Sequence, residues 1–195
     1  MATSIFMLAE KAKDILGKGD IQALASACID AYAVVVKQGW YENKQDGTSE
    51  VDGAFVYTFK NVAPILDLDL DKYYAVIPSS YVRLPHEMGI NYVSLMANQN
   101  KPFMRLNSGS IGMWSNLKSN VLGGHQTYYV EGIRMYFPKM TNVSNGNILL
   151  KLSIALDNVD VDETLNIPPD MASMIVDMVV AKYQPKPEVK PDTLQ

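Results

Sequence analysis

The sequence contains one cysteine and two histidines among 195 residues. A single cysteine excludes an intramolecular disulfide framework, and these three side chains cannot by themselves provide the four ligands of a structural zinc site. Cys28 lies on an apolar stripe with helical spacing, so we expect a buried and unreactive thiol rather than a nucleophile. No metal ion and no cofactor are expected.

Charged residues are also scarce. They make up 19% of the chain, and the formal net charge is −4. A general nucleic-acid-binding protein would carry a basic stripe, which this composition excludes. Tyrosine and methionine are plentiful, with 11 of each. Because the cores of protein interfaces are depleted in Lys and Glu, this balance is typical of a subunit of an oligomer.

Long apolar runs are absent. No stretch approaches the roughly 20 residues that a bilayer-spanning helix requires. The first residues, MATSIFMLAEKAKD, lack the charged region and the longer apolar core of a secretory signal. We therefore expect a cytoplasmic product without a membrane segment.

Acidic residues alternate with leucines in ILDLDLD, residues 65–71. Asp67, Asp69 and Asp71 begin like a calcium-binding EF-hand loop, but Lys72 and Pro78 occupy the positions that would need Gly and Glu. The alternation instead predicts a half-buried strand or turn whose acidic side faces water.

Catalytic motifs are incomplete. His86-Glu87 would need a histidine at position 90 to form the H-E-x-x-H of a zinc protease, and that residue is Ile90. Neither phosphate-binding glycine motif occurs, nor does the G-x-S-x-G of a serine hydrolase. A small hydrolase that uses His86 or His125 with a carboxylate is the weakest alternative, because no nucleophile–base pattern supports it.

Two short helices are predicted in residues 1–38. Residues 4–16 have helical apolar spacing, with Thr3 or Ser4 as N-cap and Gly17 as C-cap. Asp20 caps a second helix that continues through Val36. The short connection predicts an αα-hairpin, with a single kinked helix as the alternative. The polar segment 39–53 is expected to be a surface loop.

A β-rich part is predicted over residues 54–156. Short strands are expected at residues 54–61, 73–77, 90–96 and 101–106. Residues 128–156 predict a long β-hairpin, because two alternating runs flank a polar loop that contains Asn145-Gly146. Since an isolated hairpin is marginal in water, its outer part is a candidate contact arm. The candidate interface residues of this arm are Thr141, Asn142, Val143, Ser144 and Asn145.

A C-terminal helix is predicted over residues 168–183. It is apolar nearly all round, which indicates burial in the core or against another subunit. Met174, Met178 and Val180 are its candidate interface residues. Residues 185–195 form an extended, proline-rich tail that cannot fold alone, and Pro185 and Pro187 are candidate contacts with a neighbouring subunit. These elements predict one α+β domain over residues 1–184, with a tail.

The order of these elements resembles the head-to-tail ring, or connector, proteins of crAss-like short-tailed bacteriophages. The similarity covers most of the chain from about Pro64 onward. The segments that carry it are Pro64-Ile65-Leu66-Asp67-Leu68, Leu84-Pro85 with Gly89-Ile90, Phe103-x-Arg105, Tyr128-Tyr129-Val130-Glu131-Gly132, a strand with a Leu-x-Ile-x-Leu pattern, and Ile167-Pro168 before the last helix.

The resemblance implies a non-enzymatic subunit of a ring of twelve copies beneath the portal protein. Such a ring extends the DNA channel and docks the tail, and DNA passes through it without specific binding. The protein would be assembled in the bacterial host cytoplasm and located in the virion. Its partners would be the portal protein and other ring or tail proteins. The alternative is another virion component, such as a capsid-decorating or tail protein.

Overall fold

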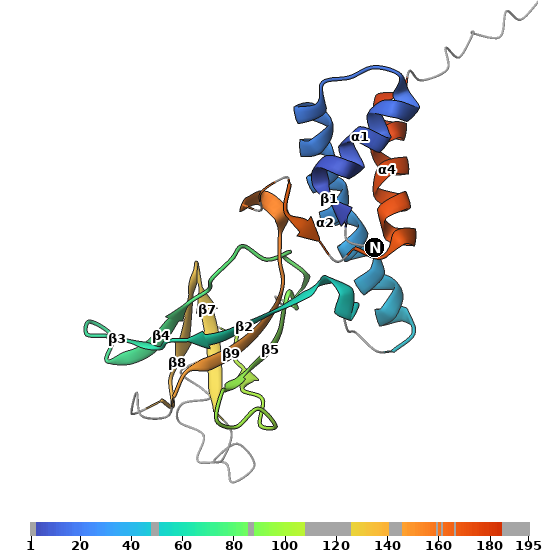
Figure 1. The fold of residues 1–195 in the computed structure, drawn as a ribbon. Helices are drawn as coiled ribbons and strands as arrows, with labels where there is room; N and C mark the ends of the chain where they lie inside the picture. The colour runs from blue at the N-terminus through green and yellow to red at the C-terminus, as the bar shows by residue number, and fades with distance from the viewer. Residues whose placement is uncertain are drawn as a thin grey trace, which may run out of the picture. The chain divides into compact units, whose positions relative to one another are not determined.

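A computed structural model of the chain describes residues 3–47, 51–85, 88–107, 126–140, 146–158, 160, 162–165 and 167–184. These residues form three long helices and a set of mainly antiparallel strands, which confirms the α+β class (Figure 1). Their contacts divide into a helical unit, residues 1–38 with 159–195, and a β unit, residues 39–158. We expected one domain over residues 1–184. In the helical unit, Thr3–Ser4 pairs with Thr164–Leu165, whereas the other strands pair among themselves in the β unit.

The first helix, α1 (Ile5–Leu16), begins and ends where the sequence predicts. The Ser4 hydroxyl accepts a hydrogen bond from the Met7 amide at 3.2 Å, as an N-cap. Gly17 ends the helix in the left-handed conformation, with φ 68°, which glycine adopts without steric cost. Its amide donates to the Lys13 carbonyl at 2.8 Å.

The second helix, α2 (Ile21–Gln45), is longer than predicted. Asp20 caps it by accepting a hydrogen bond from the Ala23 amide at 3.2 Å. The segment that we expected to open a loop at residue 39 continues the helix to Gln45, because Trp40 is buried there and anchors it. Lys44, one turn on, lies 5.1 Å from the Trp40 ring centroid. The junction of α1 and α2 bends by 113°, so the pair is more open than an antiparallel hairpin.

The last helix, α4 (Pro169–Tyr183), matches its predicted range and packs against α1. Pro169 occupies its first turn, where a backbone amide would have no hydrogen-bond partner within the helix, so the lack of an amide hydrogen in proline costs nothing. Its buried side chains are small or branched: Ala172, Ile175, Val176, Val179 and Val180. A short antiparallel pair links the residue stretches that precede α1 and α4, with β1 (Thr3–Ser4) against β10 (Thr164–Leu165).

The described strands of the β unit form two sheets. In the three-stranded sheet, β9 (Ile148–Ser153) lies between β2 (Val56–Val62) and β5 (Ile90–Leu95), antiparallel to both. A short 3₁₀ turn, Gly53–Phe55, leads into β2. All of β9 except Lys151 is buried. Because successive side chains of a strand point to opposite faces, both faces of this central strand are covered.

The five-stranded sheet has the order β3 (Ile65–Asp67), β4 (Lys72–Val76), β8 (Arg134–Phe137), β7 (Thr127–Glu131) and β6 (Met104–Arg105). All of its pairs are antiparallel except β6 with β7, which is parallel. One face carries Ala75, Met135 and Phe137, all buried. Phe137 packs edge-on against Phe103 with ring centroids 5.6 Å apart.

The predicted long hairpin over residues 128–156 is wrong. β7 turns back into β8 at Gly132-Ile133, and β9 belongs to the other sheet. Gly132 has φ 61°, so it supplies the left-handed residue that we assigned to Asn145-Gly146. β9 finds partners on both sides in β2 and β5, which are distant in sequence, and a local hairpin would satisfy only one side.

Candidate interaction surfaces

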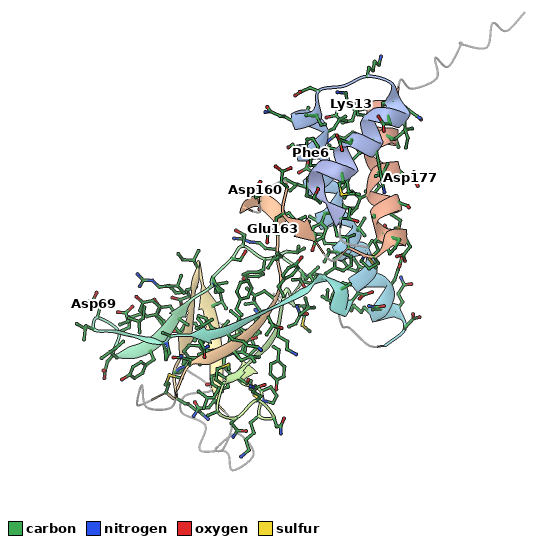
Figure 2. The ribbon with its side chains drawn as sticks, viewed as in Figure 1. Phe6, Lys13, Asp69, Asp160, Glu163 and Asp177 are labelled. Atoms are coloured by element: carbon green, nitrogen blue, oxygen red, sulfur yellow. The ribbon has the colours of Figure 1, made fainter. Side chains whose placement is uncertain are left out.

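The hairpin of β3 and β4 ends in an exposed apolar tip. We define the tip as residues 65–71, which include the turn between the two strands. Leu68 is 85% exposed, Leu70 48% and Leu66 38%. Figure 2 labels Asp69 at the outer end of this hairpin. All three leucines therefore face solvent, which contradicts the expectation that the leucine side would be half-buried. Asp69 and Asp71 are exposed as expected, and only Asp67 is partly buried.

Asp67 is the acid that departs from that expectation. Its Oδ1 accepts hydrogen bonds from the amides of Asp69 at 3.1 Å and Leu70 at 3.3 Å, which fixes the turn. Its Oδ2 accepts from Arg134 Nη1 at 3.3 Å. The Tyr136 hydroxyl donates to the same oxygen at 3.4 Å. We call these contacts of Asp67, Arg134 and Tyr136 the clasp. The Asp67 side chain is only 11% exposed, so the sheet holds this acid and its leucine neighbours point outward.

Three tyrosines form a row across the five-stranded sheet beside the clasp. Tyr74, Tyr136 and Tyr129 are cross-strand partners on β4, β8 and β7. The rings of Tyr129 and Tyr136 stack at 5.2 Å with an interplanar angle of 15°, and those of Tyr74 and Tyr136 lie 5.7 Å apart. Such contacts add to the free energy of burial. The tyrosine row therefore packs three neighbouring strands together beside the clasp.

Two cations lie on the tyrosine row. Arg134 lies 4.6 Å from the Tyr74 ring centroid, and Lys72 lies 5.7 Å from that of Tyr129. The Lys72 ammonium also donates to the Tyr129 hydroxyl at 3.5 Å. Burial raises the pKa of Tyr129 above its usual value, and Lys72 partly opposes that shift. Hydrogen bonding to Tyr136 raises the pKa of Arg134, which stays charged in any case.

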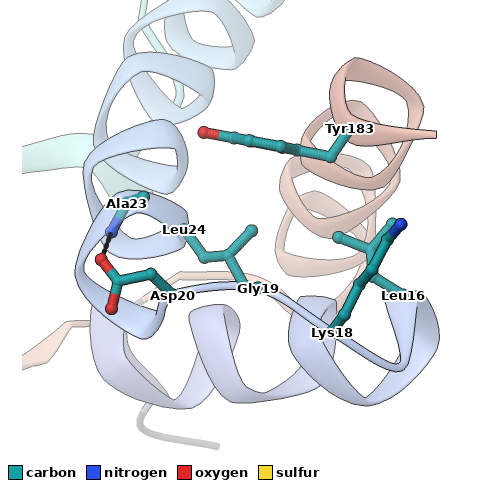
Figure 3. Close-up of a pocket in the computed structure, with 7 residues that line it drawn as sticks. All are labelled: Leu16, Lys18, Gly19, Asp20, Ala23, Leu24 and Tyr183. Carbon is teal, nitrogen blue, oxygen red and sulfur yellow. Dashed lines mark hydrogen bonds between the residues drawn. The ribbon is translucent and has the colours of Figure 1, made fainter. Parts of the chain in front are cut away.

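The helical unit has an apolar groove of about 190 Å³ where the α1–α2 junction meets the end of α4 (Figure 3). We call it the junction groove, and its lining residues are Leu16, Lys18, Gly19, Asp20, Ala23, Leu24 and Tyr183. Leu24 points into it, and the Tyr183 ring lies across it from α4. Gly19 has φ +130°, and a Cβ there would lie 3.1 Å from Leu24 Cδ1. Glycine therefore lets the chain pass close to Leu24.

The candidate interface residues on α4 have different environments. Met174 is 39% exposed, whereas Met178 is half-buried in a smaller groove that Ala27, Ala31 and Val34 of α2 help to line. Val180 is 7% exposed and belongs to the core of the helical unit. Of these three residues, Met174 offers the most surface to a partner.

Several other predicted residues lie outside the described part of the chain. These are the arm residues Thr141, Asn142, Val143, Ser144 and Asn145, the tail residues Pro185 and Pro187, and both histidines, His86 and His125. Cys28 is described: its side chain is fully buried, as predicted, and burial raises the pKa of the thiol to about 11.

Among the described residues, no group of three or more His, Cys, Asp or Glu side chains is placed to hold a metal ion. No single helix in this part of the chain is long and apolar enough to cross a membrane. The bent pair of α1 and α2 meets that criterion of length and composition only when the two are taken together.

Sequence reasoning missed Arg134, Lys18 and Tyr183. The alternation at residues 65–71 does not indicate that Asp67 is covered, because its partner Arg134 is 67 residues away in sequence. Lys18 lies in a predicted helix break, and Tyr183 is the last residue of a predicted helix. No sequence motif marks either residue as part of a groove.

Comparison of the chain with protein-family models and with curated protein sequences found no match.

Proposed function

We propose that this chain is a non-enzymatic structural subunit of a virion, in a ring of the connector between portal and tail. Its copies associate into a closed ring that extends the DNA channel and docks the tail. The portal protein and other ring or tail proteins are its partners. The resemblance of its ordered segments from Pro64 onward suggests this role, and the surfaces described above are compatible with it.

The observation that carries the proposal is the exposed tip of the β3–β4 hairpin. Leu66, Leu68 and Leu70 are all exposed at the end of this hairpin, which is unfavourable for an isolated monomer because it leaves apolar surface in water. Burial of that surface against another protein recovers this free energy. The hydrogen bonds of the clasp restrain the turn, which lowers the conformational entropy that the tip loses on binding.

The net negative charge of the chain supports a channel through which DNA passes without being bound. With a net charge of −4, the subunit lacks the excess of Lys and Arg that would neutralise DNA phosphates and release their counterions. A channel made of such subunits would let the genome slide.

Negative-stain electron microscopy of the purified protein, alone and mixed with the portal protein of the same particle, tests the proposal. We expect closed rings in at least one of the two samples, and density for the chain below the portal in the intact particle. A monodisperse monomer in both samples would contradict it. Density on the capsid surface or along the tail would instead assign the chain to another virion position.

A further inference from the structure

We propose that the tip of the β3–β4 hairpin of one copy docks into the junction groove of a second copy, with Leu68 in the groove. This inference rests on the proposed function, because it identifies the contact that joins neighbouring subunits. It makes the subunit contact heterologous, since two different surfaces of the same chain meet.

The tip is suited to insertion. Leu68 lies in the turn, where no strand covers it, and it is the most exposed large apolar side chain among the described residues. The two amide hydrogen bonds to Asp67 hold the turn from inside, so the leucine projects from a fixed backbone. A preformed, apolar, protruding group loses little conformational entropy when it enters a cavity.

The groove is suited to receive a leucine. Leu16, Ala23 and Leu24 make an apolar lining, and the half-exposed Tyr183 ring forms one wall. Its volume of about 190 Å³ admits an aliphatic side chain but not a drug-sized ligand, which typically needs at least about 300 Å³. A side chain on a narrow hairpin is the better occupant.

Charge favours contact of the tip with the groove over contact of two tips. The tip carries Asp69 and Asp71 on its exposed turn, so two tips would repel each other. The groove has the exposed Lys18 at its edge. It also contains Asp20, but that carboxylate accepts the Ala23 amide at the start of α2, where the helix dipole offsets its charge. The acidic tip therefore meets a basic edge.

A heterologous contact has a consequence for assembly. When each copy offers its tip to the next and receives a tip in its groove, the subunits form a closed ring if the rotation between them closes, and a filament if it does not. An isologous contact would stop at a dimer. The proposed contact therefore accounts for a ring from one kind of subunit.

Engineered cysteines test the contact directly, because the only native cysteine, Cys28, is fully buried. The variant Leu68→Cys with Lys18→Cys, oxidised mildly at assembly concentration, is expected to give a ladder of disulfide-linked oligomers on a non-reducing gel. Two matched pairs serve as controls: Ile133→Cys with Lys18→Cys, and Leu68→Cys with Lys37→Cys. Ile133 and Lys37 are also exposed, and neither belongs to the tip or the junction groove.

A mixing experiment then tests direction. The variant Leu68→Asp has a damaged tip and an intact groove. The variant Tyr183→Asp has an intact tip and a damaged groove. We expect each variant alone to associate at least about tenfold more weakly than the native chain, since each loses the burial of an apolar side chain. An equimolar mixture is expected to form dimers, because one intact tip and one intact groove remain. A mixture that stays monomeric would overturn the heterologous contact.

The outcomes separate this inference from the function on which it depends. If the native chain forms rings but the variant with Leu68→Cys and Lys18→Cys gives no stronger a ladder than the controls, only the contact is refuted. A disulfide that forms within one chain would also refute only the contact. A ladder that appears only after removal of residues 185–195 would refute it too, because the tail would then be the occupant of the groove. If the native chain never associates, alone or with the portal protein, the proposed function fails.

Discussion

Arg134 on β8 reaches across β4 to donate a hydrogen bond to Asp67 on β3, at 3.3 Å. On the way, its guanidinium lies over the ring of Tyr74, the β4 residue between them. One side chain thus joins three strands and fixes the turn that presents Leu68. The candidate interaction surface of the β unit therefore depends on this long-range contact as well as on the two local bonds from the turn amides to Asp67.

Replacement of Asp67 by asparagine tests the clasp. The variant Asp67→Asn keeps an oxygen that can accept the two turn amides, but it loses the charged oxygen that binds Arg134 and Tyr136. We expect a loss of about 1 kcal/mol in the free energy of unfolding, a modest value because the Arg134 side chain is half-exposed and solvent screens the pair. Urea unfolding measures it, with Asp69→Asn on the same turn as control. Equal midpoints for the two variants would refute the clasp.

Substitutions of Tyr136 separate its ring from its hydroxyl. Tyr136→Phe removes the bond to Asp67 and is expected to cost less than about 1.5 kcal/mol. Tyr136→Ala also removes the stack on Tyr129 and leaves a cavity, so we expect a loss of about 3–5 kcal/mol. Thermal unfolding followed by circular dichroism measures both. If the phenylalanine variant were as unstable as the alanine variant, the tyrosine row would not be the main support of the sheet.

The Cys28 thiol should respond to unfolding and to high pH. Its pKa is raised from 9.0 to about 11 because burial favours the neutral form. The resulting contribution to stability is complete below pH 9 and is lost as the pH rises through 11. We expect a thiol reagent to label the native protein far more slowly than the urea-unfolded protein at pH 8. Fast labelling of the native protein would show that the helical unit opens readily around α2.

The arm residues Thr141, Asn142, Val143, Ser144 and Asn145 are open to an independent test. Replacement of residues 141–145 by five Gly and Ser residues keeps the connection from β8 to β9 at its native length. We expect an unchanged unfolding midpoint and weaker assembly, as sedimentation velocity would report. Assembly equal to that of the native chain would remove this segment from the interface, and a scrambled sequence of the same five residues controls for composition.

Local signals in the sequence predicted the helices well. Ser4, Gly17 and Asp20 mark helix ends because a cap needs only its own neighbours, and the structure places all three as caps. Apolar spacing also located α4 and most of the short strands. The end of α2 was missed because burial of Trp40 outweighs the polar, turn-rich composition that follows it.

Pairing between distant strands was not predictable in the same way. Both Gly132 and Gly146 have positive φ, so the sequence offers two turns and only the partners of β9 select between them. The exposed leucines were missed for a similar reason. Alternation predicts half-buried leucines and exposed acids, but Arg134 and Tyr136 bind Asp67 and the leucines stay exposed. The candidate site therefore depends on tertiary contacts that no local pattern contains.

Sedimentation velocity of the native chain beside Leu68→Asp and Ile133→Asp is the most direct test of the account. Leu68 and Ile133 are both strongly exposed, so neither substitution is expected to change folding. We predict that the native chain and Ile133→Asp associate alike, and that Leu68→Asp sediments as a monomer with an unchanged unfolding midpoint. The same distribution of species for all three proteins would contradict the claim that the β3–β4 tip is the assembly surface.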